Sequence, residues 1–490
     1  MKKLSLKLSN ILRLLIVTIW GVLFILLVRR DVYVNAIDLS EQQTIRQAAS
    51  TEYQSIYFRN DKIGFIVNDF KSRPDNTLLL KQHALMHLNV AGAVQTIELN
   101  LRANLSASNL LKNFSFSFQS PFYRMQTEGT VNGNVVSYKL ATGSNTIRDT
   151  IIFTTPPLLS SSRRPYLLTA GVKTGEKRKI SWFDPVSLTG KESIVEYHGK
   201  DSVLINGRVH ALHRFTESFS GIRVNSWLDD SGIVIKEESP AGFVFLKEPQ
   251  FKALNLPDTG EEILASVSIK TQTKIPEELG KSMQYRLYFP QEIKFDLHGG
   301  RQQYQDNILT ITRENIPADS TIATCPDIGD SLTPSAYIQS DHQEIKELTR
   351  KITSGALKPT QRVQKLSSWV YKNLDKRSVI GLPDALTTLK NRQGDCNEHA
   401  ALMAAMARSV AIPTRIAAGV TYHKDAFYYH AWNEVCLGDR WVSIDTTTNQ
   451  FPADLTHLKF IQGELQEQVR ISGLLGRLTI EPILQEINHE

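Results

Sequence analysis

The stretch RQGDCNEHAALMAAMARS, residues 392–409, places one of only three cysteines directly before a run of small and apolar side chains. Gly394 and Asp395 precede Cys396, and five alanines follow between positions 400 and 407. This composition predicts a helix buried on most of its surface, because small side chains let neighbouring elements approach closely. Cys396 would then lie in the first turn, where backbone N–H groups and the helix dipole favour the thiolate. The alternative is a buried cysteine with a packing role only.

A thiol nucleophile needs a base and an orienting group, and the segment YYHAWNEVCLGDRWVSIDTT, residues 428–447, offers both. The residues 437–440 predict the turn of a β-hairpin, and this turn sets the register of its two strands. In that register Asp445 faces Trp432, and His430 lies diagonally on the same face, at about 7–8 Å. A slip of one residue would separate the imidazole from the carboxylate. The pattern therefore predicts a His–Asp pair downstream of the candidate nucleophile.

A zinc site is a competing interpretation of some of these residues. Cys396 and His399 are three positions apart on the predicted helix, and they could join His430 and Cys436 as ligands. The hairpin register argues against this site, because it places Cys436 far along the strand from His430. Trp432 is expected to shield the carboxylate from water. We therefore expect neither a metal nor a cofactor.

The segments GDCNEHA, HAWNEV and WVSIDTT resemble the Cys, His and Asp motifs of the transglutaminase-like superfamily, and their spacings of 34 and 15 residues suit it. The resemblance covers about residues 340–455. It implies a papain-like α+β domain in which Cys396 is the nucleophile, His430 the general base and then acid, and Asp445 the orienting carboxylate. It also implies acyl transfer from a peptide or protein amide substrate through a thioester on the cysteine.

Three outcomes are open for such a domain. Hydrolysis by a cysteine peptidase or amidase is expected, because water is always present, whereas a competing amine must be bound and oriented. A true cross-linking transglutaminase is the second outcome. The third is a catalytically idle module that binds peptides or scaffolds a complex.

The chain before this region has the pattern of antiparallel β-structure. Residues 55–70 predict a hairpin, and Asn-Gly pairs at 132–133 and 206–207 are strong hairpin signals. We expect a β-rich extracytoplasmic domain over 45–325, which could divide into two subdomains.

Helical periodicity begins only after this β-rich region. Turn formers predict a linker at 326–339, and helices followed by strands predict the catalytic domain at 340–455. A C-terminal extension at 456–490 should pack on the catalytic domain. The predicted fold class is α+β.

The N-terminus is basic and strongly apolar. Residues 1–30 contain six basic residues and no acidic one, so the rest of the chain has 50 of each sign, which is not typical of a nucleic-acid-binding surface. Residues 11–28 carry one charge and are long enough to cross a bilayer. An uncleaved anchor over 9–30 is expected, because the nearest small-residue cleavage site follows a charged stretch. The charge bias predicts a single-pass protein of the bacterial envelope, with most of the chain extracytoplasmic.

Overall fold

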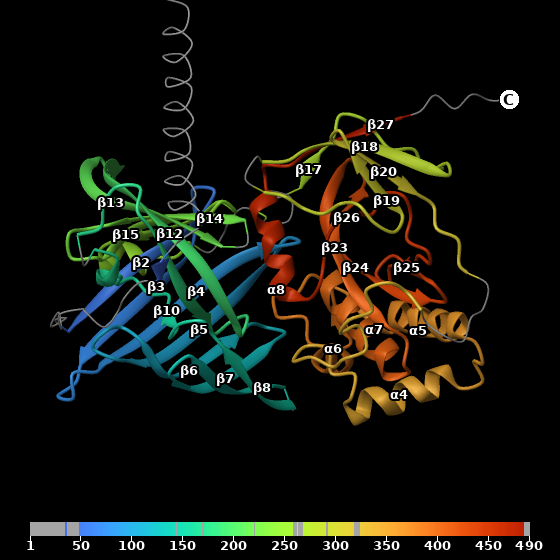
Figure 1. Ribbon diagram of the computed structural model, residues 1–490, viewed down its shortest axis with the longest axis horizontal. Helices are drawn as coiled ribbons and strands as arrows, with labels where there is room; N and C mark the ends of the chain where they lie inside the picture. The colour runs from blue at the N-terminus through green and yellow to red at the C-terminus, as the bar shows by residue number, and fades with distance from the viewer. Residues whose placement is uncertain are drawn as a thin grey trace, which may run out of the picture.

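The computed structural model describes residues 35–36 and 49–484, apart from gaps at 144, 169–170, 220, 258–261, 263–267, 291–292 and 318–323. The anchor predicted over 9–30 lies outside the described residues. Within the described part of the chain, no helix combines the length and apolar character needed to cross a membrane. Two bodies lie side by side, one dominated by long strands and one mixed (Figure 1).

The first body is built on one 16-stranded sheet. Its order is β1-β11-β12-β13-β14-β15-β16-β2-β3-β4-β5-β6-β7-β8-β9, and β10 pairs with β11. The predicted Asn-Gly turns are confirmed, with left-handed φ values of 59° at Gly133 and 76° at Gly207. Antiparallel pairing of β16 with β2 joins two successive meanders, so the two subdomains left open by the sequence share one sheet.

The elements of the first body are β1 (Asn35–Ala36), β2 (Ser50–Phe58), β3 (Asp61–Ser72), β4 (Leu78–Val90), β5 (Ala93–Leu105), β6 (Leu111–Gln119), β7 (Arg124–Asn132), β8 (Val135–Thr142), β9 (Asn145–Ile152), β10 (Leu158–Leu159), η1 (Pro165–Leu167), β11 (Lys177–Asp184), β12 (Thr189–Ile205), β13 (Arg208–Phe219), β14 (Ile222–Leu228), β15 (Val234–Glu238), β16 (Phe243–Lys247) and α2 (Gln250–Ala253).

The second body combines helices with three smaller sheets, of orders β17-β24-β23-β26 (with β25 beside β24), β19-β20-β18-β27 and β21-β22. Its elements are β17 (Ile269–Lys270), β18 (Ser282–Tyr288), β19 (Gln302–Gln305), β20 (Ile308–Thr312), α4 (Gln343–Thr353), α5 (Pro359–Asn373), β21 (Asp375–Lys376), α6 (Ala385–Asn391), β22 (Gln393–Gly394), α7 (Cys396–Ser409), β23 (Thr414–His423), β24 (Ala426–Leu437), β25 (Arg440–Ile444), β26 (Leu458–Gln462), α8 (Leu465–Gln468), η2 (Val469–Leu474) and β27 (Thr479–Ile483). A large β-rich region followed by a helix-containing body fits the predicted α+β class.

The predicted boundary at residue 325 is wrong for the sheets. The strands β17, β18, β19 and β20 belong to the second body, because β17 pairs with β24 and β18 pairs with β27 near the end of the chain. The predicted C-terminal extension likewise contributes β26 to the central sheet, where β26 pairs with β23. Strand periodicity along the chain shows where strands form, but it does not show which distant partner each strand takes.

The predicted linker at 326–339 is tied to the second body at both ends. A disulfide joins Cys325, just before it, to Cys436 of β24, and Trp441 packs against this bridge. At the other end, Ile338 is buried in the core under α7. The linker therefore has a fixed path in spite of its turn-forming composition.

The two bodies are in direct contact. Ser120, in the β6–β7 turn, donates to the Ile380 carbonyl at 2.6 Å, and Thr142 of β8 donates to the Asp384 carboxylate at 2.9 Å. Asp384 is the N-cap of α6 and also accepts from the Thr387 backbone N–H at 2.6 Å. Since α6 directly precedes the turn that leads into α7, the large sheet supports the segment that carries Cys396.

Candidate active site

Cys396 is the first residue of α7, as the sequence predicts. Asp395 is the N-cap, and its side chain accepts from the Asn397 backbone N–H at 3.0 Å. Glu398 completes a capping box by accepting from the Asp395 backbone N–H at 2.9 Å. Gly394 is required here, because a Cβ at this position would lie 2.3 Å from the Glu398 side chain. The turn and helix start are thus determined by local sequence.

The thiol itself differs from the expectation of a readily formed thiolate. Burial raises the pKa of Cys396 well above its ordinary value, and the carboxylate of Asp395 raises it further. A hydrogen bond from the backbone of Ala431 acts in the opposite direction but does not outweigh them. Deprotonation of this thiol therefore needs a base at the time of reaction. The Ala431 contact shows that the residue after His430 lies beside the sulfur.

His430 and Asp445 form the predicted pair. The observed register of β24 with β25 is the predicted one, continuing to Asn433 opposite Ile444. His430 Nε2 lies 2.9 Å from Asp445 Oδ2, with both side chains buried. Burial alone would raise the pKa of Asp445, but His430 and a second histidine, His457, hold it well below its ordinary value. Asp445 is therefore an ionised acceptor.

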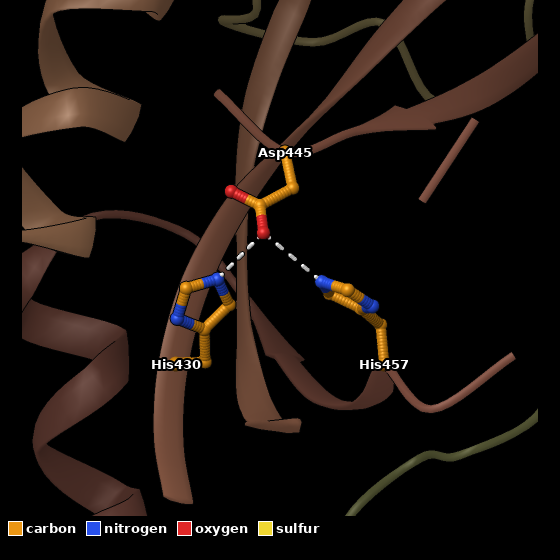
Figure 2. Close-up of side chains that lie close together, drawn as sticks. All are labelled: His430, Asp445 and His457. Atoms are coloured by element: carbon orange, nitrogen blue, oxygen red, sulfur yellow. Dashed lines mark hydrogen bonds and ion pairs between the residues drawn. The ribbon is translucent and has the colours of Figure 1, made fainter. Parts of the chain in front are cut away.

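His457 is the residue that sequence reasoning missed. Its Nε2 lies 3.2 Å from the same Asp445 Oδ2, and its Nδ1 lies 3.0 Å from Asp454 Oδ1. Figure 2 shows the two imidazoles converging on one oxygen of the carboxylate, His430 on the left and His457 on the right. The only sequence signal is the pairing of Asp454 with His457 three residues later, and such a spacing is common in turns.

Close packing of β26 against β23 makes this arrangement possible. A bulge between Ala418 and Gly419 shifts the register of the two strands. A Cβ at Gly419 would lie 1.9 Å from the Leu458 carbonyl oxygen, so only glycine permits this approach. His457, directly before β26, is thereby brought beside Asp445.

Trp432 covers this group of side chains. Its ring stacks on His430 with centroids 6.2 Å apart and meets His457 edge-on at 5.2 Å. The indole is only 2% exposed and covers one side of the two histidines.

The zinc site considered from the sequence is not formed. Cys436 is bonded to Cys325 and so cannot serve as a thiolate ligand. His399 is buried, and its Nδ1 hydrogen-bonds to the Asp395 carbonyl oxygen at 2.7 Å. A different set, His430, Asp445 and His457, has ligand atoms within 4.8 Å of one another, close enough for one metal ion. In the structure these atoms are already joined by hydrogen bonds.

Comparison with known families confirms the resemblance seen in the sequence. Residues 346–446 match the family described as the transglutaminase-like superfamily, so this part of the chain is a domain of that superfamily. The match supports a thiol-dependent enzyme of this superfamily in general terms. Cys396, His430 and Asp445 lie inside the matched range, and His457 lies beyond it. A comparison with curated proteins finds no match.

Solved structures show only distant likeness to the chain. A “putative cysteine protease” from Cytophaga hutchinsonii is 16% identical, over 44% of this chain and 82% of that one, with a TM-score of 0.29. A “putative protease” from Parabacteroides distasonis is 12% identical, over 68% and 69%, with a TM-score of 0.20. A β-barrel-like protein of unknown function from Brucella abortus is 12% identical, over 41% and 97%, with a TM-score of 0.31. These low scores carry no argument about activity.

Proposed function

We propose that this protein is a cysteine enzyme that hydrolyses amide or peptide bonds through a thioester on Cys396. The observation that carries the proposal is the buried His430–Asp445 hydrogen bond of 2.9 Å, next to the sulfur-contacting Ala431, in a domain of the matching superfamily. In this proposal His430 is the general base and acid, and Asp445 fixes its tautomer and orientation.

The raised thiol pKa suits a mechanism in which the proton moves only when substrate is present. His430 takes the Cys396 proton as the sulfur attacks the substrate carbonyl carbon, which gives a tetrahedral oxyanion. Backbone N–H groups in the first turn of α7 would stabilise that oxyanion. Collapse breaks the C–N bond, and the amine leaves with the proton from His430. Water then attacks the thioester, with His430 again as base, and releases the carboxylic acid and the thiol.

The first experiment tests the nucleophile and its base. All three cysteines are described, and Cys396 alone is unpaired, so an iodoacetamide probe on the unreduced full chain should add one label, at Cys396. His430→Ala should slow labelling at neutral pH by about 10-fold or more, because the Cys396 thiol loses the base that takes its proton as the sulfur reacts. The control is His423→Ala, which removes an exposed histidine at the far end of β23. Equal labelling rates in all three proteins would favour the idle-module alternative.

The second experiment identifies the reaction. A peptide-substrate screen by mass spectrometry would find an acyl donor, and Cys396→Ala should abolish its turnover. Alanine fits the helix of small side chains, so the variant should stay folded. With a primary amine added in millimolar excess, we expect free acid as the main product. Predominant amine adducts would replace the hydrolase proposal with a cross-linking transglutaminase.

We also propose that the enzyme is a single-pass envelope protein with its catalytic body outside the cytoplasm, acting on a peptide or protein. The Cys325–Cys436 disulfide supports an oxidising compartment. The positive charge before the apolar segment supports the orientation. A reporter fused after Glu490 should be active only outside the cytoplasm, and a cytoplasmic reporter signal would overturn this topology.

A further inference from the structure

We propose that Asp454 and His457 are a positioning pair that fixes the Asp445 carboxylate for His430. This inference deepens the proposed function and rests on it. Neither residue belongs to the region that matches the superfamily, which ends at residue 446. Both would act through Asp445 rather than on the substrate.

The geometry of Asp445 is the first support. Its Oδ2 is shared by His430 Nε2 at 2.9 Å and His457 Nε2 at 3.2 Å, and the two rings converge on this one oxygen (Figure 2). The Thr448 hydroxyl donates to the same oxygen at 2.5 Å, and the Thr447 backbone N–H donates to Oδ1 at 2.7 Å. Without His457, Oδ2 would keep its contacts with His430 and Thr448 but lose its one charged donor, so the carboxylate would be held less firmly beside His430.

The protonation of His457 is the second support. Its two ring nitrogens each face a carboxylate oxygen, so both must carry a proton for the two contacts to be hydrogen bonds. Burial alone would lower the pKa of His457, but Asp445 and Asp454 outweigh burial and raise it. A cation on this side keeps Asp445 ionised. His430 then keeps its Nε2 proton on Asp445 and presents its other ring nitrogen as the base (Figure 2).

The third support is that the loop that carries Asp454 and His457 is held in place. Arg301, which precedes β19, donates to the Ala453 carbonyl at 2.5 Å and to the His457 carbonyl at 3.1 Å. Asp454 Oδ1 is itself fixed by the Thr456 backbone N–H at 2.8 Å. A side chain held at both its backbone and its ring can impose an orientation on its neighbour.

Two substitutions at His457 separate positioning from packing. His457→Phe keeps the ring volume but removes both hydrogen bonds, and His457→Gln retains an amide N–H that can reach Asp445. In the full-length protein we expect His457→Phe to lower kcat by about 100-fold, since small misplacements of a base have effects of this size. KM should change less than about threefold, because the pair does not touch substrate. His457→Gln should recover at least about a tenth of the wild-type kcat.

An NMR measurement on His430 tests the positioning pair without a substrate, so it can separate failure of this inference from failure of the proposed function. With 15N-histidine labelling, the hydrogen-bonded Nε2–H signal of His430 should move or broaden in His457→Phe and stay near its wild-type position in His457→Gln. Asp454→Asn is a milder variant in case the Phe variant unfolds, and it should shift the His457 signal first. The control is His423→Phe, the same replacement at an exposed position of β23.

The results have clear readings. An unchanged His430 signal and unchanged kcat in His457→Phe would overturn the positioning role, as would a Gln variant as impaired as the Phe variant. If the wild-type protein turns over no substrate but the His430 signal still shifts in His457→Phe, the positioning pair is supported and only the proposed function is contradicted.

Discussion

Acidification should destabilise the second body through one buried carboxylate, Glu434 of β24. Glu434 accepts from Arg415 Nε of β23 at 2.7 Å and from Lys459 Nζ of β26 at 2.6 Å. These three residues join three neighbouring strands, β24, β23 and β26, of the sheet that holds His430 and leads to His457. Protonation of Glu434 would leave two cations beside a neutral group in a buried position.

The magnitude follows from the pKa shift. Burial alone would raise the pKa of Glu434, but Lys459 and then Arg415 outweigh burial and lower it from 4.5 to about 2. At about 1.4 kcal/mol per unit, this shift contributes about 3 kcal/mol to folding. Because the folded pKa is the lower one, the contribution is complete above about pH 5 and is lost as the pH falls toward 2. About 2 kcal/mol should be lost between pH 6 and pH 3.

The assay is urea unfolding of the oxidised protein at pH 6 and at pH 3, followed by tryptophan fluorescence. Trp441 is a local reporter, since the Arg415 guanidinium lies 4.0 Å from its ring centroid. Glu434→Gln removes the titrating group. It should lower the free energy of unfolding at pH 6 by about 3–5 kcal/mol, because two buried cations lose their partner. Wild type should then lose about 2 kcal/mol more than this variant on acidification.

An exposed ion pair provides the matched control. Lys274 and Asp425 lie 3.2 Å apart with side chains 80% and 70% exposed, so Asp425→Asn should change stability by less than about 0.5 kcal/mol at either pH. Asp445 and Asp454 also have lowered pKa values and also favour folding above acidic pH, but they are present in every protein compared. If wild type and Glu434→Gln lose the same stability on acidification, the carboxylate is not held ionised by the two cations, and our reasoning is refuted.

Three further predictions concern how the site is held in place. Replacing Cys325 and Cys436 by serine removes a disulfide whose cysteines are 111 residues apart in the chain. The loss should lower the free energy of unfolding by about 4–5 kcal/mol on a chain-entropy estimate, measured as a lower Tm. An unchanged Tm would mean that the disulfide does not constrain the unfolded chain. Asp384→Ala should cost about 2–3 kcal/mol by urea unfolding, since the α6 cap and the bond to Thr142 are both lost, whereas Thr142→Val should cost less. Gly419→Ala should lower the free energy of unfolding by about 1–3 kcal/mol, because the new Cβ meets the Leu458 carbonyl oxygen. It should also speed amide hydrogen exchange in β26. Unchanged exchange in β26 would show that this strand can move away from β23 freely.

Features governed by local chemistry were accessible from the sequence. The turn at 437–440 sets the hairpin register, and since side chains alternate with a period of two, that register brings His430 to Asp445. The helix that begins at Cys396 is predicted by the small residues after it, and the structure adds the capping pair Asp395 and Glu398. Hairpins of the large sheet likewise follow from their Asn-Gly turns. The superfamily domain, confirmed over 346–446, is marked by these same local segments.

Only the tertiary structure decided the features that depend on distant partners or on burial. His457 reaches Asp445 because Gly419 lets β26 approach β23, and that contact depends on which strand lies at the sheet edge. The boundary expected at 325 moved because β18 pairs with β27, almost 200 residues later in the chain. The thiol pKa of Cys396 rises rather than falls, because burial in the assembled body outweighs the hydrogen bond from the Ala431 backbone. Sequence periodicity does not show which distant strands pair, and it does not show how deeply one side chain is buried.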